Sequence, residues 1–138
     1  MKPVLGVDLG EKRTGVALSD DLRMLAHPLE TIASASPKMV AQRLQKIVVE
    51  RQVNCVVVGL PRQMNGALGL AAKNAQHFVE KLRSLVSCEV VTWDERLSTV
   101  AAERALRDAG KKTRETRGIR DQVAAQIILQ SYLDRLNA

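Results

Sequence analysis

The hydrophobic period changes at Pro37, and this change limits the folds open to the chain. Before Pro37, three runs typical of extended strands follow one another with short connections, at residues 4–9, 14–19 and 24–32. Short connections join antiparallel neighbours, because a parallel crossover needs a dozen or more residues. The pattern therefore predicts a meander of three antiparallel strands.

After Pro37, helical and strand periods alternate. Ser36 and Pro37 open a helix whose apolar positions recur at i, i+4, i+7 and i+8. Residues 53–59 are nearly all apolar, as in a strand covered on both faces, and residues 89–93 read as a fifth strand. We therefore expect an α/β fold with one mixed five-stranded sheet, three antiparallel strands followed by parallel strands, and helices on both faces.

Three further helices are predicted. One follows the strand at residues 53–59, and another starts at Ser98 or Thr99 and ends at Gly110. We expect residues 111–118 to form a polar, basic loop, and the last helix to span residues 119–136. The inner side of the helix after residue 59 is expected to carry Ala71, Ala75, Phe78, Val79, Leu82 and either Leu85 or Val86.

The length of 138 residues predicts a single domain, residues 1–138. No stretch approaches the ~20 apolar residues of a membrane span, and the first apolar run is broken at Asp8, too early for a signal peptide. Cys55 and Cys88 form no C-x-x-C pair, which indicates a reducing compartment. We expect a cytoplasmic protein without a membrane partner.

The net charge of +6 is concentrated near the C-terminus. Residues 104–120 hold seven Lys and Arg against two Asp and Glu, a net charge of +5. Such a cluster favours a polyanion through phosphate contacts and counterion release, although a solvated surface carries similar runs. With only three aromatic residues for base stacking, a nucleic acid would be held mainly through its backbone.

Acidic residues end two of the predicted strands. Asp8 follows the first apolar run, and Asp94 and Glu95 follow the fifth strand. If these strands are parallel, both ends open onto the same edge of the sheet, where ligand sites gather in α/β folds. Asp8 equally suits a turn cap, and the run at residues 94–96 equally suits an exposed strand end.

A third carboxylate lies at the start of the last helix. At about 100° per residue, Asp121 shares a face with Ala124, Ala125, Ile128 and Tyr132 and should point toward the sheet. An inward carboxylate needs a partner, although the helix dipole alone also favours Asp in a first turn. The polar stripe of this helix consists of Gln122, Gln126, Gln130 and Asp134.

Asp8, Glu95 and Asp121 together suggest acidic groups held by hard cations. Mg²⁺ and Mn²⁺ prefer oxygen ligands and keep several waters, so few protein carboxylates are needed. Two such ions about 4 Å apart activate a water and stabilise the leaving oxygen of a phosphodiester. Without metal, the three carboxylates should repel one another.

Four motifs, in chain order, resemble the YqgF (RuvX-like) family of ribonuclease H-like nucleases. They are GVDLGEKRTGVA at 6–17, VGLP at 58–61 with NG at 65–66, DERLST at 94–99, and DQVAAQIILQ at 121–130. Together they span nearly the whole chain. One departure is Arg120, which stands where the family usually has an aliphatic residue. The segment at residues 59–66 would be a substrate-facing loop or a plain turn.

The resemblance implies a ribonuclease H-like fold and a metal-dependent nuclease that processes the 5′ end of precursor 16S rRNA during ribosome biogenesis. Its catalytic and metal-binding triad falls on Asp8, Glu95 and Asp121, with Mg²⁺ or Mn²⁺ as cofactor and two ions expected. Asp94 is not included. Expected partners are structured RNA and a ribosomal particle. The side chains expected to bind nucleic acid are Lys12, Arg13, Arg62, Arg96, Lys111, Lys112, Arg114 and Arg117.

Other functions are kept open or set aside. The family has also been described as Holliday junction resolvases, which act on four-way DNA as two-fold dimers, whereas end trimming needs only a monomer. A non-catalytic module that docks on RNA or a transcription complex would use the same fold. The chain lacks a G-x-x-x-x-G-K-[ST] phosphate loop and the second lobe of an actin-like ATPase. His27, Cys55, His77 and Cys88 show no zinc-ligand spacing.

Overall fold

The computed structural model describes residues 2–61, 68–98 and 114–138, with residues 114–118 described by backbone alone. The helix predicted between Ser98 and Gly110 therefore lies outside the described residues, as do Arg62, Lys111 and Lys112. No helix of the described segments is long and apolar enough to cross a membrane.

A five-stranded mixed sheet forms the centre of the molecule, in the order β3-β2-β1-β4-β5. The antiparallel part contains β1 (Val4–Asp8), β2 (Thr14–Ser19) and β3 (Ala26–Ile32). The parallel part pairs β4 (Cys55–Leu60) with β1 and β5 (Glu89–Asp94) with β4. The predicted sheet is thus confirmed, with β1 at its centre.

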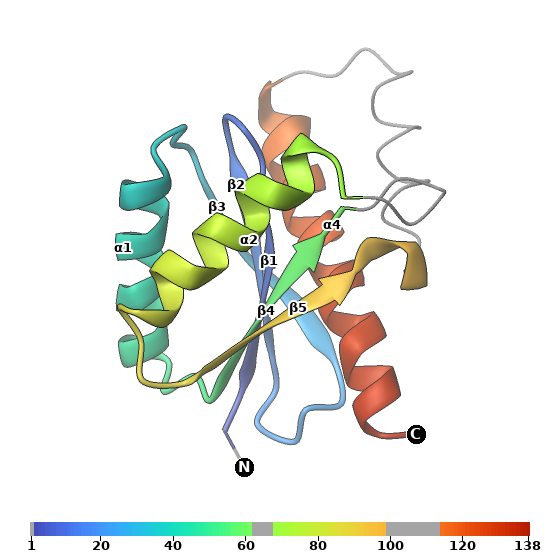
Figure 1. The fold of residues 1–138 in the computed structure, drawn as a ribbon. Helices are drawn as coiled ribbons and strands as arrows, with labels where there is room; N and C mark the ends of the chain where they lie inside the picture. The colour runs from blue at the N-terminus through green and yellow to red at the C-terminus, as the bar shows by residue number, and fades with distance from the viewer. Residues whose placement is uncertain (1, 62–67, 99–113) are drawn as a thin grey trace.

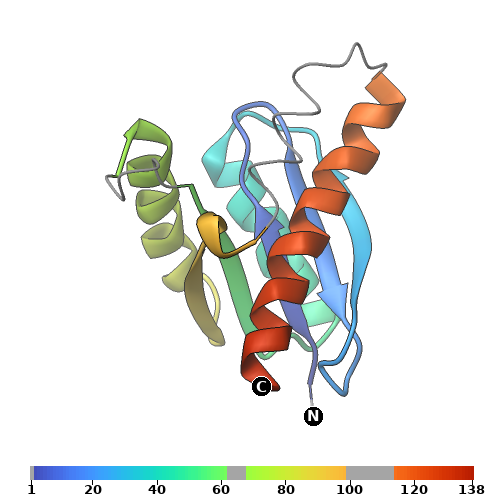
Figure 2. The ribbon, with the colours of Figure 1, turned by 90° about the vertical axis from the view of Figure 1, so that its right-hand side faces the viewer.

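Helices cover both faces of the sheet (Figures 1 and 2). On one face lie α1 (Pro37–Glu50), which begins after the capping residue Ser36, and α2 (Leu70–Arg83). On the other face lies α4 (Arg114–Leu136). A short 3-10 helix, η1 (Glu95–Leu97), follows β5 directly.

Each strand divides its side chains between the two layers, because successive side chains point to opposite faces. In β1, Leu5 and Val7 are buried among the residues of α1 and α2, whereas Val4 packs against α4. In β4, Val56 and Val58 belong to the core between the sheet and helices α1 and α2, and Val57 belongs to the core between the sheet and α4. Because Asp8 is four residues after Val4 in the same strand, it lies on the same face of the sheet, the face that α4 covers.

The structure corrects two details of the predicted helices. The buried stripe of α2 begins at Ala72, while Ala71 is exposed, so the predicted stripe was one residue out at its start. The last helix begins at Arg114 rather than at residue 119, so residues 114–118 are helical and not a loop. Arg and Glu are good helix formers, and they extend the helix despite their charge and Gly118.

Candidate active site

Asp8 is the last residue of the central strand and is buried, with only 4% of its surface exposed. It lies on the sheet face that α4 covers, at the carboxyl end of β1. β4 and β5 run parallel to β1, so their carboxyl ends reach the same edge of the sheet. The positions of Glu95 and Asp121 are therefore described relative to Asp8.

Asp121 approaches Asp8 from above the neighbouring strand. Gly15 of β2 lies directly opposite Asp8 in the sheet register. A Cβ atom at Gly15 would collide with the backbone carbonyl of Asp121, much closer than real Cβ contacts allow. Only a glycine lets this turn of α4 rest on the sheet, and Asp121, 7% exposed, is buried there as predicted.

Glu95 approaches from the other side of Asp8. Val7 is opposite Val58 in the parallel pair, so Asp8 and Gly59 are at the same level, one residue further along. A Cβ atom at Gly59 would lie 3.3 Å from the Cγ atom of Glu95. The Glu95 side chain, 4% exposed, therefore lies over Gly59 on the α4 face.

The two glycines thus flank Asp8, one beneath Asp121 and one beneath Glu95. Gly15, Asp8 and Gly59 belong to the neighbouring strands β2, β1 and β4, so the three acidic residues lie over three adjacent strands. Adjacent strands are about 4.8 Å apart. The sequence predicted that these three carboxylates share a site, and that shared site stays a prediction. The sequence did not predict that Gly15 and Gly59 lie beneath Asp121 and Glu95, although both glycines belong to the family-like motifs at residues 6–17 and 58–61.

The rotation of α4 about its axis is set by its polar stripe. Gln122 donates to the Thr31 hydroxyl at 3.2 Å, and Gln126 donates to the Ala26 carbonyl at 3.0 Å. Gln130 bonds both the Met24 carbonyl and the Ala26 amide. These three Gln side chains bind the edge strand β3 and Met24, which precedes it. The neighbouring face of α4, which carries Asp121, is therefore held against the sheet.

Asp94 has a separate role from Glu95. Its carboxylate accepts the Arg96 backbone N–H at 2.9 Å, which caps η1, and it forms an ion pair with the Arg96 guanidinium at 2.7 Å. The side-chain hydrogen bond between the guanidinium and Asp94, together with the charge of Asp94, raises the pKa of Arg96 above its usual value. The cap turns the chain at the strand end and leaves Glu95 as the buried acidic residue of the pair.

Asp121 is engaged by Arg13. The Arg13 Nε atom lies 2.8 Å from Asp121 Oδ2, and the Arg13 side chain is 34% exposed. Among the described residues, no group of three or more His, Cys, Asp or Glu side chains is arranged to hold a metal ion. The donor types at this edge are the oxygens that hard cations prefer, but Asp121 is directed toward a guanidinium.

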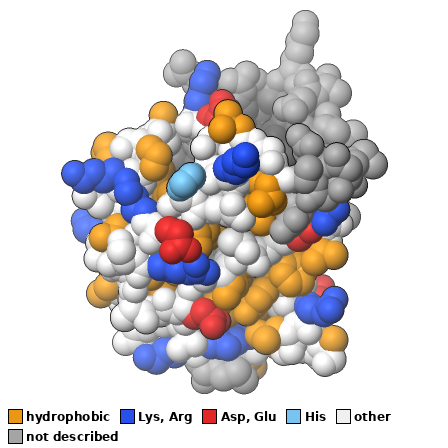
Figure 3. Space-filling view, in the orientation of Figure 1, with side chains coloured by type: hydrophobic (Ala, Val, Ile, Leu, Met, Phe, Trp, Pro, Cys, Tyr) orange, Lys and Arg blue, Asp and Glu red, His pale blue; other side chains and the backbone are white. Residues whose placement is uncertain are grey.

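The other predicted nucleic-acid contacts are spread around this edge. Lys12 is exposed in the turn between β1 and β2, while Arg13 and Arg96 are paired with carboxylates. Arg114 and Arg117 belong to the first turns of α4. Over α1 and α2, Figure 3 shows more blue than red side chains, and the two helices carry six Lys and Arg against two Glu.

The histidines and cysteines form no zinc site within the described segments. His27 and His77 are exposed. Both cysteines are free, and burial raises the pKa of the Cys55 thiol to about 11 and also raises the pKa of Cys88. A raised pKa keeps these thiols protonated and weakly nucleophilic near neutral pH.

A family described as "RuvX: Holliday junction resolvase" matches residues 2–135. The chain belongs to the RuvX family. Several curated RuvX-family relatives carry the name "Putative pre-16S rRNA nuclease". One from Geobacillus kaustophilus is 48% identical over 132 residues, covering 94% of this chain and 96% of the relative. Another from Endomicrobium trichonymphae is 44% identical over 135 residues, covering 97% and 96%.

Solved structures confirm the ribonuclease H-like fold of this RuvX-family chain. Thermus thermophilus RuvC, solved with a Holliday junction substrate, matches with a TM-score of 0.59 at 15% identity, covering 100% of this chain and 97% of RuvC. The fowlpox virus resolvase, also solved with junction DNA, matches with a TM-score of 0.56 at 12% identity, covering 99% of each chain. The RuvX-family chain is a nuclease, a hydrolase of phosphodiester bonds.

The Arg13–Asp121 ion pair should contribute to the stability of this RuvX-family protein. Replacing Arg13 by Ala removes the guanidinium that contacts a buried carboxylate, and we expect a loss of about 1–2 kcal/mol in the free energy of unfolding, reduced by the partial exposure of Arg13. Urea denaturation measures this loss. Arg96→Ala, which breaks a more exposed pair, is the matched control and should lower the free energy of unfolding less than Arg13→Ala does. Equal losses in the two variants would contradict the prediction that the Arg13–Asp121 ion pair stabilises the protein more than the Arg96–Asp94 pair.

Proposed function

We propose that this chain is a metal-dependent nuclease that processes the 5′ end of precursor 16S rRNA during ribosome biogenesis. The observation that supports the proposal is that Asp8, Glu95 and Asp121 are all buried, with Asp121 packed over Gly15 and Glu95 over Gly59. The name of the curated relatives, at 44–48% identity, supports the choice of RNA substrate.

The triad of Asp8, Glu95 and Asp121 would hold Mg²⁺ or Mn²⁺, with two ions in the productive complex. Bound ions of this kind lower the pKa of a water and stabilise the charge on the leaving oxygen. All three side chains offer oxygen donors, which fits such cations. Asp121, whose Oδ2 atom contacts Arg13 in this structure, would be the third carboxylate that holds the ion.

The protein's own groups would then do the positioning. Asp8 is held at the end of the central strand, Glu95 by η1, and Asp121 by the α4–β3 hydrogen bonds. Arg13, released from Asp121 or shared with it, would lie within reach of a substrate phosphate. The remaining phosphate contacts proposed from the sequence are Lys12, Arg62, Arg96, Lys111, Lys112, Arg114 and Arg117.

The proposed cellular setting follows from this substrate. Structured precursor rRNA is the expected partner, either free or within a ribosomal particle. Free cysteines with raised pKa values are compatible with a reducing compartment, and we infer a cytoplasmic location.

A second candidate function is the resolution of four-way DNA junctions. The description of the matching family favours it. Symmetrical cleavage of a junction would need two active sites related by a two-fold axis, and therefore a dimer. The mass of the protein in solution with and without junction DNA separates this function from end trimming by a monomer.

The test is a cleavage assay on both substrates. Purified protein is incubated with labelled precursor 16S rRNA and with a labelled four-way DNA junction, each with Mg²⁺, with Mn²⁺ and with chelator. We expect cleavage of the RNA near the mature 5′ end, dependent on metal. Cleavage of the junction alone would replace the proposal by the second candidate. Binding without cleavage in every tube would contradict both and favour a docking module.

A further inference from the structure

A cleft of about 720 Å³ opens on the sheet face opposite the carboxylates, between α1, α2 and the turn after β1. Its wall includes Leu9 and Gly10, which directly follow Asp8. The volume is in the range of sites for small organic molecules. The cleft therefore begins one residue from the candidate active site, around the edge of the sheet.

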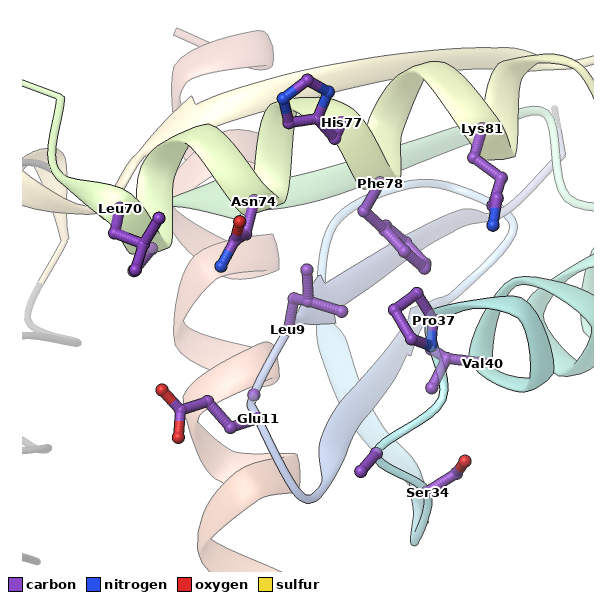
Figure 4. Close-up of a pocket in the computed structure, with 13 residues that line it drawn as sticks. Leu9, Glu11, Ser34, Pro37, Val40, Leu70, Asn74, His77, Phe78 and Lys81 are labelled. Carbon is purple, nitrogen blue, oxygen red and sulfur yellow. The ribbon is translucent and has the colours of Figure 1, made fainter.

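The inner wall of the cleft is apolar. Figure 4 shows Leu9, Pro37 and Phe78 pointing toward one another from the turn after β1, from α1 and from α2. Val40 and the exposed Ala71 complete this wall. Such a wall suits the faces of a flat, weakly polar group.

Polar groups stand at the rim. Lys81 extends from α2 toward Pro37, Asn74 points down from the same helix, and Glu11 lies on the side of the turn after β1 (Figure 4). The ring of His77 points away from Leu9 and Pro37. The rim thus offers one cation for an anionic group, an amide that both donates and accepts, and an acceptor of hydrogen bonds.

We propose that this cleft binds one unpaired nucleotide of the substrate strand, next to the cleaved phosphodiester. The inference rests on the proposed nuclease function and adds a substrate feature to it. The base would lie against Leu9 and Pro37 with its edge at Asn74, and a flanking phosphate would pair with Lys81. Unpaired bases are the part of RNA that proteins read by such packing and edge contacts.

Continuity with the carboxylates favours a nucleotide within a strand over a free small molecule. Leu9 belongs to the cleft, whereas Asp8 faces the opposite side of the sheet. A strand that crosses the sheet edge at this turn would place one nucleotide in the cleft and its neighbouring phosphodiester at the triad.

The test uses Ala71→Trp, which fills the cleft from an exposed position, and Gln76→Trp, an exposed position of α2 that does not line the cleft. RNA substrates carry the fluorescent base 2-aminopurine at single positions next to the cut and are bound in chelator. We expect one unpaired position to change its fluorescence with wild type and Gln76→Trp but not with Ala71→Trp. Ala71→Trp should also raise KM about tenfold for this RNA, but not for a fully paired one.

A second pair of variants tests the phosphate contact. Lys81→Ala should weaken binding of the RNA with the unpaired nucleotide several-fold, and Lys73→Ala, on the same helix but outside the cleft, should not. If wild type cleaves RNA and Ala71→Trp behaves like Gln76→Trp, the cleft inference is wrong and the nuclease function stands. Saturable binding of a nucleoside 5′-monophosphate to the cleft without any effect on RNA would also overturn it. Absence of cleavage by wild type itself would instead contradict the proposed function.

Discussion

Asp8→Asn is expected to reduce kcat by about a hundredfold or more while leaving KM for nucleic acid nearly unchanged. The substitution keeps the shape of a buried side chain at the end of the central strand but removes its charge. A group that acts mainly in the transition state affects kcat far more than substrate binding. Steady-state cleavage of precursor RNA with Mg²⁺, together with thermal unfolding of both proteins, measures the effect.

Asp94→Asn is the matched control for this prediction. Asp94 is an acidic residue at a neighbouring strand end, but its carboxylate caps η1 and pairs with Arg96. Asn keeps the capping acceptor, so cleavage should change only a few-fold. If Asp94→Asn abolished cleavage and Asp8→Asn did not, the assignment of the triad would be wrong.

Gly15→Ala is expected to produce the largest loss of stability among the substitutions considered. The added Cβ would overlap the backbone carbonyl of Asp121, which cannot move aside as a side-chain tip can. Overpacking typically costs about 1–3 kcal/mol in the free energy of unfolding. Because this collision is with backbone, we expect Gly15→Ala to cost about 3 kcal/mol or more. α4 must shift away from the sheet, so cleavage should fall as well. Urea denaturation and cleavage at a temperature where the variant is folded measure the two effects.

Gly69→Ala is the comparison for Gly15→Ala. Gly69 is the N-cap of α2 with φ of −81°, a value that any residue adopts, so its replacement should cost only the difference in capping, about 1 kcal/mol. A similar small loss for Gly15→Ala would show that the contact between α4 and the sheet at Gly15 is looser than the structure indicates.

The order of elements could be predicted because it depends on local patterns. The strands around Val7 and Val57 and the helix after Pro37 are encoded by short-range hydrophobic periods and by one capping residue. The burial of Asp121 could also be predicted, since its face of the helix carries Ala124 and Ala125. These inferences needed only the geometry of single helices and strands.

The partners of the functional side chains could not be predicted in the same way. Arg13 and Asp121 are 108 residues apart, and their contact depends on the register of β1 with β2 and on how closely α4 rests on the sheet. The sequence placed Arg13 among the phosphate contacts. The structure places its Nε atom 2.8 Å from a carboxylate oxygen of Asp121.

The sequence by itself determined the mixed sheet, the helices on its faces and the burial of Asp121, because local periodicity and short connections suffice for these. Only the tertiary structure decided that Asp121 packs over Gly15 and Glu95 over Gly59, that Arg13 pairs with Asp121, and that a cleft opens on the sheet face opposite Asp8. These features are distances between layers, and distances between layers follow from packing that no single segment encodes.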